Sequence, residues 1–80
     1  MWSRPVAFVH EKRGLQQVRS SLEALRVLDN WWVKVDGEAY RAAIDICIEA
    51  VQGQRSQEDA RAAFITALVE GQIDIEPDRG

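Results

Sequence analysis

A series of apolar residues between positions 40 and 51 recurs with the spacing of an α-helix. Its members, alternately three and one residues apart, are Tyr40, Ala43, Ile44, Cys47, Ile48 and Val51. With 3.6 residues per turn, this spacing places all six side chains on one side of a helix. Gly53 follows, where helices commonly end on a left-handed residue. The sequence therefore predicts a helix over about residues 37–52, capped by Asp36, with one face buried.

A second helix is predicted over about residues 21–32. Ser20 and Glu23 have the spacing of a capping box, in which each side chain bonds a backbone N–H at the start of a helix. The apolar residues that follow at nearly helical spacing are Leu22, Leu25, Leu28 and Trp32. We expect this stripe to face the core.

A third helix is predicted over about residues 57–70. Ser56 precedes two acidic residues, which is typical of a helix start. The apolar stripe of this segment, which stops before Gly71, consists of Ala60, Ala63, Phe64, Ala67 and Leu68. Its small alanines would allow another helix to approach closely.

The N-terminal part of the chain predicts a β-hairpin over about residues 5–19. Residues 5–10 are rich in β-branched and aromatic side chains, and Gly14 supplies a positive φ for the turn before the second arm. A two-stranded hairpin is marginal in water, so we expect one of its faces to lie on the helices.

In the tail, residues 72–80, positions 72–76 alternate polar and apolar residues. They predict either a short edge strand or a docked tail.

Together these elements predict one α+β domain over residues 1–80, with the hairpin followed by three helices packed on one face. One Cys and one His exclude a disulfide framework and a zinc site made only of Cys and His from one chain. No apolar run approaches the roughly 20 residues that span a bilayer, and no basic-then-apolar leader opens the chain. We expect a cytoplasmic protein that does not enter a membrane.

Several short motifs in a fixed order resemble a family of small bacterial proteins, domain of unknown function family 982. The motifs are Trp2 and Pro5, Ser20-x-x-Glu23-Ala24-Leu25, Trp31-Trp32-Val33, Gly37-x-Ala39-Tyr40, Cys47 followed by Gly53, and residues 60–65. The resemblance runs from Trp2 to about Ile75. Trp32 stands where family members tend to have Pro. The resemblance implies a fold, but no activity, substrate or cofactor.

No residue set in the sequence makes a convincing catalytic or metal site. Cys47 lies on an apolar helix face, and the only nearby type of base is His10, so a buried structural thiol is the better interpretation. Asp45 and Glu49 could share a metal, but Arg41 one turn earlier favours an ion pair with Asp45. The acids at positions 74, 76 and 78 alternate along the tail and could bind a cation weakly, but charged residues at the edge of a sheet more often keep it soluble. We expect no enzyme, no catalytic residue, no cofactor and no metal.

Charge is unevenly distributed along the chain. Residues 1–28 carry five Lys and Arg against two Glu, a balance of +3, whereas residues 29–80 carry five against eleven acids, a balance of −6. The basic residues Lys12, Arg13 and Arg19, with Trp2 as a stacking surface, could hold single-stranded nucleic acid. The acidic total and the lack of a basic recognition helix argue against it, so nucleic-acid binding is the alternative hypothesis.

The leading hypothesis is a non-enzymatic protein-interaction module, as a homodimer in which the +3 and −6 segments complement each other. Trp31 and Trp32 are about 100° apart on a helix, so they cannot both point into one core. An exposed indole beside Val33 and Tyr40 would form an apolar partner surface. The other interpretation is that both rings cover the small core. A small-ligand binder or enzyme has least support.

Overall fold

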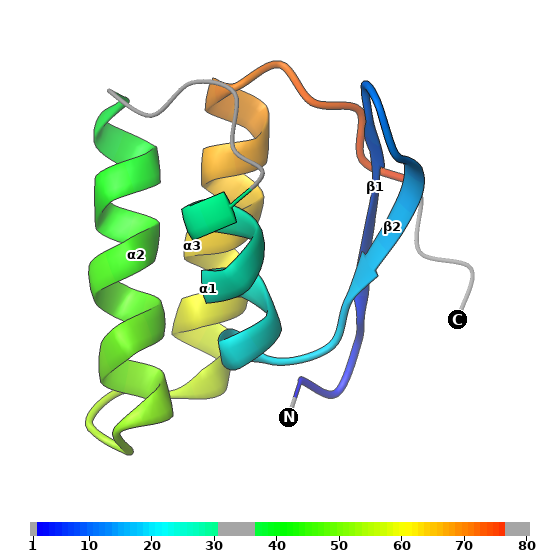
Figure 1. Cartoon of the computed structure of the whole chain (residues 1–80). Coiled ribbons are helices and arrows are strands. Elements are labelled where there is room, and N and C mark those ends of the chain that lie inside the picture. Colours follow the sequence, from blue (N-terminus) through cyan, green and yellow to red (C-terminus); the bar gives the residue numbers. More distant parts are fainter. Residues whose placement is uncertain (1, 31–36, 77–80) are drawn as a thin grey trace.

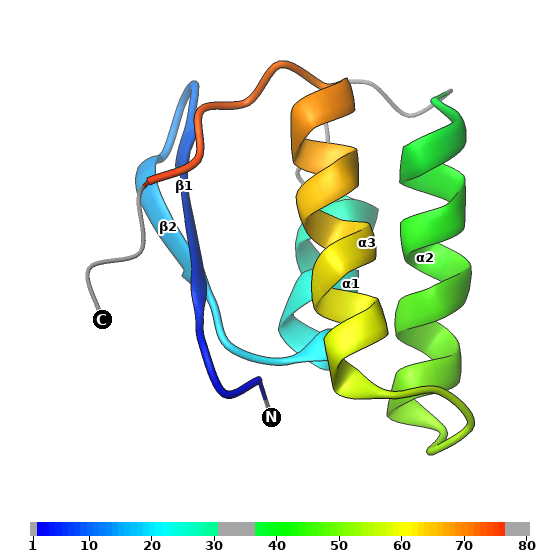
Figure 2. The same cartoon turned by 180° about the vertical axis from the view of Figure 1, so that it is seen from behind.

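The computed structural model describes residues 2–30 and 37–76 and shows a small antiparallel hairpin followed by three helices. The elements are β1 (Val6–His10), β2 (Gly14–Val18), α1 (Ser21–Asn30), α2 (Glu38–Val51) and α3 (Gln57–Glu70). In Figures 1 and 2, α1 and α3 lie between the hairpin and α2. This arrangement confirms the predicted α+β class and the order of its elements. The predicted end of the first helix at residue 32 lies outside the described residues.

The hairpin is antiparallel, with a register that runs from Val6 opposite Val18 to His10 opposite Gly14. Gly14 has the predicted positive φ, at 74°. The imidazole Nδ1 of His10 closes the turn, because it accepts hydrogen bonds of 3.1 Å from the backbone N–H groups of Lys12 and Arg13. Alternate side chains of the hairpin are buried, so one of its faces lies on the helices as expected.

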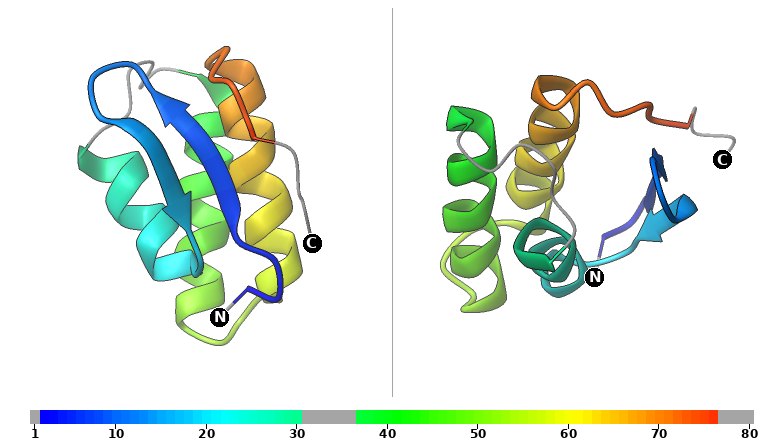
Figure 3. Two further views of the ribbon diagram at one scale, coloured as in Figure 1. Left: turned by 90° about the vertical axis from the view of Figure 1, so that its right-hand side faces the viewer. Right: turned by 45° about the horizontal axis from the view of Figure 1, so that its top comes forward.

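The C-terminal segment docks against β1 without forming a strand of its own. Ile75 makes an isolated antiparallel bridge with Phe8. The Val9 N–H donates to the Asp74 carbonyl at 2.9 Å, and the Glu76 N–H donates to the Ala7 carbonyl at 2.8 Å. In Figure 3 this segment lies beside β1, on the side opposite β2. Of the two predicted alternatives, the structure shows the docked tail.

The side-chain caps of α1 and α3 follow the sequence. Ser20 Oγ accepts from the Glu23 N–H at 3.2 Å, and Glu23 Oε1 accepts from the Arg19 N–H at 2.7 Å. In the usual capping box the carboxylate of Glu23 would accept from the N–H of the N-cap residue, Ser20. Here it accepts from the N–H of Arg19, the residue before the N-cap. Ser56 Oγ caps α3 by accepting from the Asp59 N–H at 3.1 Å.

Helix α2 is capped by a residue of another helix. Asp36, the predicted cap, lies outside the described residues, and the N-cap position is taken by Gly37, which has no side chain. The Glu70 carboxylate, from the end of α3, instead accepts from the N–H groups of Ala39 at 3.1 Å and Tyr40 at 3.2 Å. A negative charge is unfavourable at the C-terminal end of its own helix, here α3, but favourable at the N-terminal end of another helix, here α2. A Cβ at position 37 would collide with this carboxylate.

Phe64 of α3 lies at the centre of the core. Its ring centroid is 5.8 Å from that of Trp2 and 5.9 Å from that of Phe8, and the ring of Phe8 meets it edge-on. These distances suit favourable aromatic pairs. Phe64 thus joins α3 to the hairpin and to the segment before it. The predicted stripe of α3 is confirmed by its four buried residues, Ala60, Phe64, Ala67 and Leu68.

The buried faces of α1 and α2 are rotated from the predicted ones. Helix α1 buries Ser21, Ala24, Val27 and Leu28, while Leu22 is exposed. Helix α2 buries Ala43, Cys47 and Ala50, while Ile48 and Val51 are exposed. Small residues line the contact between α2 and its neighbours because they let the helices approach closely. The bulkier side chains are consequently displaced to the borders of the packed face.

Candidate interaction surface

The side chains turned away from the core gather along the seam where α1 meets α2. Leu22 is 50% exposed, Ile48 is 40% exposed and Val51 is 49% exposed. The two helices run antiparallel (Figure 1), so the start of α1 lies near the end of α2. Between them Leu25 and Ile44 are only partly covered. We refer to Leu22, Leu25, Ile44, Ile48 and Val51 as the α1–α2 face.

A hollow of about 310 Å³ lies within this face. Its apolar lining consists of Leu25, Ile44 and Ile48. Its polar lining consists of Arg26, Asp29 and Asn30, all from α1. An apolar floor with charged groups at the rim is the usual anatomy of a protein contact surface. This face was not predicted from the sequence, because the same residues fit the apolar stripes that were expected to lie in the core.

The residues predicted to form a partner surface lie mostly beyond the described part. Trp31, Trp32 and Val33 are outside the described residues. In the chain they directly follow Asn30, which lines the hollow. Tyr40 is half-buried, and its hydroxyl donates a 3.0 Å hydrogen bond to the Leu28 carbonyl. Tyr40 therefore ties the start of α2 to the last turn of α1.

The predicted nucleic-acid residues are exposed on the hairpin, but their aromatic companion is not. Lys12 and Arg13 lie in the turn, and the Arg19 guanidinium donates to Gln17 Oε1 at 3.1 and 2.8 Å. Trp2 is only 4% exposed and packs on Phe64, so the expectation that it offers a stacking surface was wrong. A small core gains more stability from burying this large indole than the chain would keep with the indole left in water.

Trp2 also starts a buried chain of hydrogen bonds that the sequence did not reveal. Its indole Nε1–H donates to Ser21 Oγ at 3.2 Å, and Ser21 Oγ donates to Gln57 Oε1 at 2.7 Å. Gln57 Nε2 then donates to the Ala50 carbonyl at 3.2 Å. This relay joins the N-terminal segment, the starts of α1 and α3 and the last turn of α2. It leaves each of these buried polar groups with a partner.

Cys47 lies fully buried between α2 and α3, with its sulfur 4.0 Å from the Ala60 carbonyl oxygen. Burial raises the pKa of this thiol from 9.0 to about 11. His10 is the last residue of β1, and the hairpin is separated from α2 by the layer of α1 and α3 (Figure 1). The structure therefore does not bring the two groups together as a nucleophile and its base.

The raised pKa of Cys47 predicts a loss of stability in alkali. Below pH 9 the thiol is protonated in both the folded and the unfolded chain, so it has no effect on the pH dependence of unfolding. Between pH 9 and about 11 the unfolded chain releases the proton and the folded chain keeps it. The free energy of unfolding should fall by about 1.4 kcal/mol per pH unit in this window. Urea unfolding at a series of pH values measures the slope.

The matched control for this experiment is Cys47→Ala. This variant should be less stable at neutral pH, because it leaves a small cavity, but its alkaline slope should be smaller by the contribution of the thiol. An equal alkaline slope in the two proteins would contradict the assignment of the effect to Cys47.

The comparisons with known proteins supply a family. The family model described as "Protein of unknown function (DUF982)" matches residues 4–75. The chain belongs to the DUF982 family. This confirms the resemblance noted in the sequence. No curated protein and no solved structure matches the chain.

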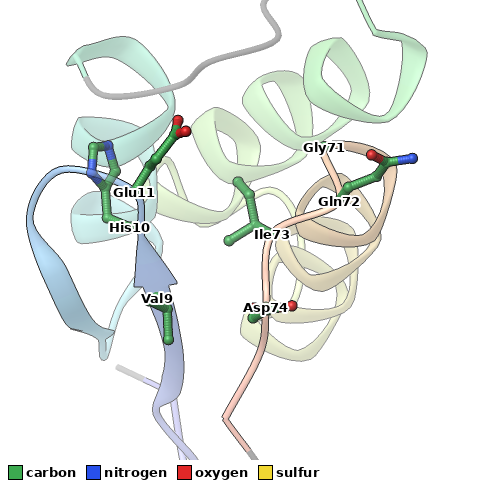
Figure 4. A pocket seen from close by; sticks show the side chains of 7 residues that line it. All are labelled: Val9, His10, Glu11, Gly71, Gln72, Ile73 and Asp74. Carbon is green, nitrogen blue, oxygen red and sulfur yellow. The ribbon is translucent and has the colours of Figure 1, made fainter.

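A hollow of about 390 Å³ in this DUF982 chain, with a mixed polar and apolar lining, lies between the end of β1 and the C-terminal segment. Figure 4 shows His10 and Glu11 on one side, Gln72 and Asp74 on the other, and Ile73 between them. The His10 Nδ1 already accepts two hydrogen bonds from the hairpin turn, so it cannot also serve as a base or a metal ligand. In the described part of the chain, no group of three or more His, Cys, Asp or Glu residues could hold a metal ion.

The acidic residues of α2 in this DUF982 chain lie in a different ion pair from the one expected. Glu49 pairs with Arg55 at 3.1 Å, beyond the end of the helix. Between the described side chains of Arg41 and Asp45, which are both exposed, the structure shows no ion pair, so that expectation was wrong. Arg55 also approaches Asp59 at 4.0 Å and so bridges α2 and α3.

No helix among the described residues is long and apolar enough to cross a membrane.

Proposed function

We propose that this protein is a non-enzymatic, cytoplasmic interaction module that forms a homodimer through the α1–α2 face. The observation that carries the proposal is the outward position of Leu22, Ile48 and Val51, each 40–50% exposed along one seam. Exposed apolar side chains beside a hollow with charged residues at its rim are typical of a protein contact. Its burial would add apolar area to a chain whose own core is small.

One opposite-charge contact supports a second copy as the partner. Helix α1 carries Arg26 beside the apolar seam, and α2 carries three acids against one Arg. A two-fold axis that lays α1 of one copy across α2 of the other would let Arg26 pair with one of the acids of α2 in the second copy. Because the contact is repeated by symmetry, each such pair would occur twice. These two symmetry-related charge pairs would favour the orientation in which the α1–α2 faces of the two copies lie antiparallel.

The state of the nucleophilic and basic side chains supports a role without catalysis. A nucleophilic cysteine needs a lowered pKa and access to substrate, whereas the pKa of Cys47 is raised and its side chain is enclosed. The Nδ1 lone pair of His10 is occupied by the hairpin turn. These contacts support a structural role for both residues: Cys47 packs in the core, and His10 holds the hairpin turn.

Sedimentation equilibrium of the wild-type chain and of Ile48→Glu tests the proposed dimer. At high micromolar concentration the wild type should approach twice the 9.1 kDa of one chain, because the apolar seam is then buried. Ile48→Glu should remain a monomer, because the dimer would bury an unpaired carboxylate. Val69→Glu is the matched control, since it makes the same change at an exposed position of α3 and should still dimerise. A monomeric wild type, or equal loss of dimer in both variants, would refute the proposal.

A further inference from the structure

The outer edge of β2 offers unpaired backbone groups. In the described part of the chain β2 pairs with β1 alone. On β1, Ala7 and Val9 direct their backbone groups towards the C-terminal segment, so the alternate residues Val6, Phe8 and His10 direct theirs towards β2. Given this register, the N–H and C=O groups of Leu15 and Gln17 point to the opposite, outer edge. Such an edge is a template for one more strand.

A groove runs beside this edge. It has a volume of about 240 Å³ and lies between β2 and α1. Its lining comes from three residues of β2, Gln16, Gln17 and Val18, and three of α1, Glu23, Arg26 and Val27. An added strand would send alternate side chains into this groove, where Val18 and Val27 favour apolar ones.

The charges around the edge are mainly positive. Lys12 lies in the turn before β2, Arg19 follows its last residue, and Arg26 lines the groove. The carboxylate of Glu23 already accepts a hydrogen bond from the Arg19 N–H, which places it at the helix start. An acidic segment would therefore meet positive charge at both ends of the edge and in the groove.

The chain's own C-terminal segment shows what the hairpin accepts at its other edge. Residues 73–76 alternate Ile with Asp or Glu, and they dock on β1 through two backbone hydrogen bonds. Ile73 packs against the core, while Asp74 is exposed. Figure 3 shows β1 between this segment and β2. An extended, alternating apolar and acidic sequence is thus already used to widen this sheet.

A second copy of the chain suits the β2 edge poorly in the register centred on Gln16. If two β2 strands paired antiparallel about Gln16, Arg13 of one copy would lie opposite Arg19 of the other. Like charges in directly opposite positions destabilise strand pairing. We infer that the outer edge of β2 binds an extended segment of a partner protein in which apolar residues alternate with Asp or Glu. This inference rests on the proposed role as an interaction module but uses a different surface, which shares Arg26 with the rim of the α1–α2 face.

Fluorescence anisotropy with a labelled synthetic peptide, in which Ile alternates with Asp or Glu, tests this inference. The wild-type protein should bind it, and added salt should weaken the binding. The same peptide with alternate backbone nitrogens methylated should bind at least about tenfold more weakly, because it cannot donate to the edge. Replacing its acids by Asn and Gln should weaken binding to a similar degree, about tenfold.

Two pairs of protein variants locate the site. Gln17→Pro removes an outward N–H without breaking the ladder to β1, whereas Gln17→Ala keeps that N–H. Arg19→Glu reverses a charge at the edge, and Arg41→Glu makes the same change on α2. We expect the first member of each pair to weaken binding about tenfold and the second to leave it nearly unchanged. If Gln17→Pro does not fold, the methylated peptide carries the backbone test.

Three results would overturn the inference. They are failure of the peptide to bind at low salt, equal binding of the methylated peptide, and displacement of the peptide by a tighter-binding single-stranded oligonucleotide. The titration is repeated with Ile48→Glu, in which the proposed dimer face is changed. Binding to this variant, together with a monomeric wild type, would refute the dimer and support the β2 edge.

Discussion

Replacing Phe64 by alanine should destabilise the fold by about 3–5 kcal/mol, the range typical of removing a buried phenylalanine. Phe64 is fully buried and contacts the rings of both Trp2 and Phe8. Its loss would leave a cavity where three parts of the chain meet, and both aromatic pairs would disappear with it. An 80-residue chain has a total stability of roughly 4–12 kcal/mol. The variant should therefore lose a large part of its stability, or all of it.

Chemical unfolding followed by tryptophan fluorescence measures this effect, because Trp2 packs directly on Phe64. Val69→Ala is the control on the same helix, since Val69 is 64% exposed and should cost no more than about 0.5 kcal/mol. A loss below about 1 kcal/mol for Phe64→Ala would mean that the surrounding residues collapse into the space. The three-ring cluster would then not be the centre of the core.

The order of the elements and the starts of α1 and α3 could be predicted because their signals are local. Ser20 and Ser56 accept hydrogen bonds at the helix starts that the sequence assigned to them. Gly14 and Gly53 have the expected positive φ, at 74° and 79°. Each of these signals depends on a few neighbouring residues, so no knowledge of the tertiary arrangement is needed.

The buried faces of the helices were harder to predict because they depend on the neighbours. Leu22 fits an apolar stripe as well as Ala24 does, but α1 packs with Ala24 and Val27 inward. In α2 the small residues Ala43 and Cys47 take the closest contacts. Hydrophobicity ranks leucine and isoleucine above alanine, whereas close helix packing favours small side chains. The exposed α1–α2 face results from this difference.

The long-range polar contacts could not be predicted from one sequence. Glu70 caps a helix that begins 32 residues earlier, and its only local signal is an acid at the unfavourable end of α3. Trp2 has no periodic neighbours that would mark it as buried. Its partner Ser21 looks like an ordinary polar residue in the first turn of a helix. Only the tertiary structure brings these groups together.

Replacing Ser21 by alanine should destabilise the fold by about 2–6 kcal/mol, although it removes a single oxygen. The hydroxyl accepts from the Trp2 indole and donates to Gln57, and it lies in a residue that is 2% exposed. Without it, two buried polar groups lose their partner, and each such loss costs about 1–3 kcal/mol. Ser56→Ala is the matched control. It removes an exposed helix cap and should cost only about 1 kcal/mol.

A double-mutant cycle with Trp2→Phe separates the relay from a simple loss of contact. Phenylalanine has no N–H, so in that background Ser21→Ala orphans only Gln57 and should cost less than it does in the wild type. We expect a coupling energy of about 0.5–3 kcal/mol between the two positions, measured by urea unfolding of the four proteins. Additive effects would contradict the relay, because the Trp2 and Ser21 contributions would then be independent. A clear coupling would show that a polar contact 19 residues apart in sequence fixes the N-terminal segment on the helices.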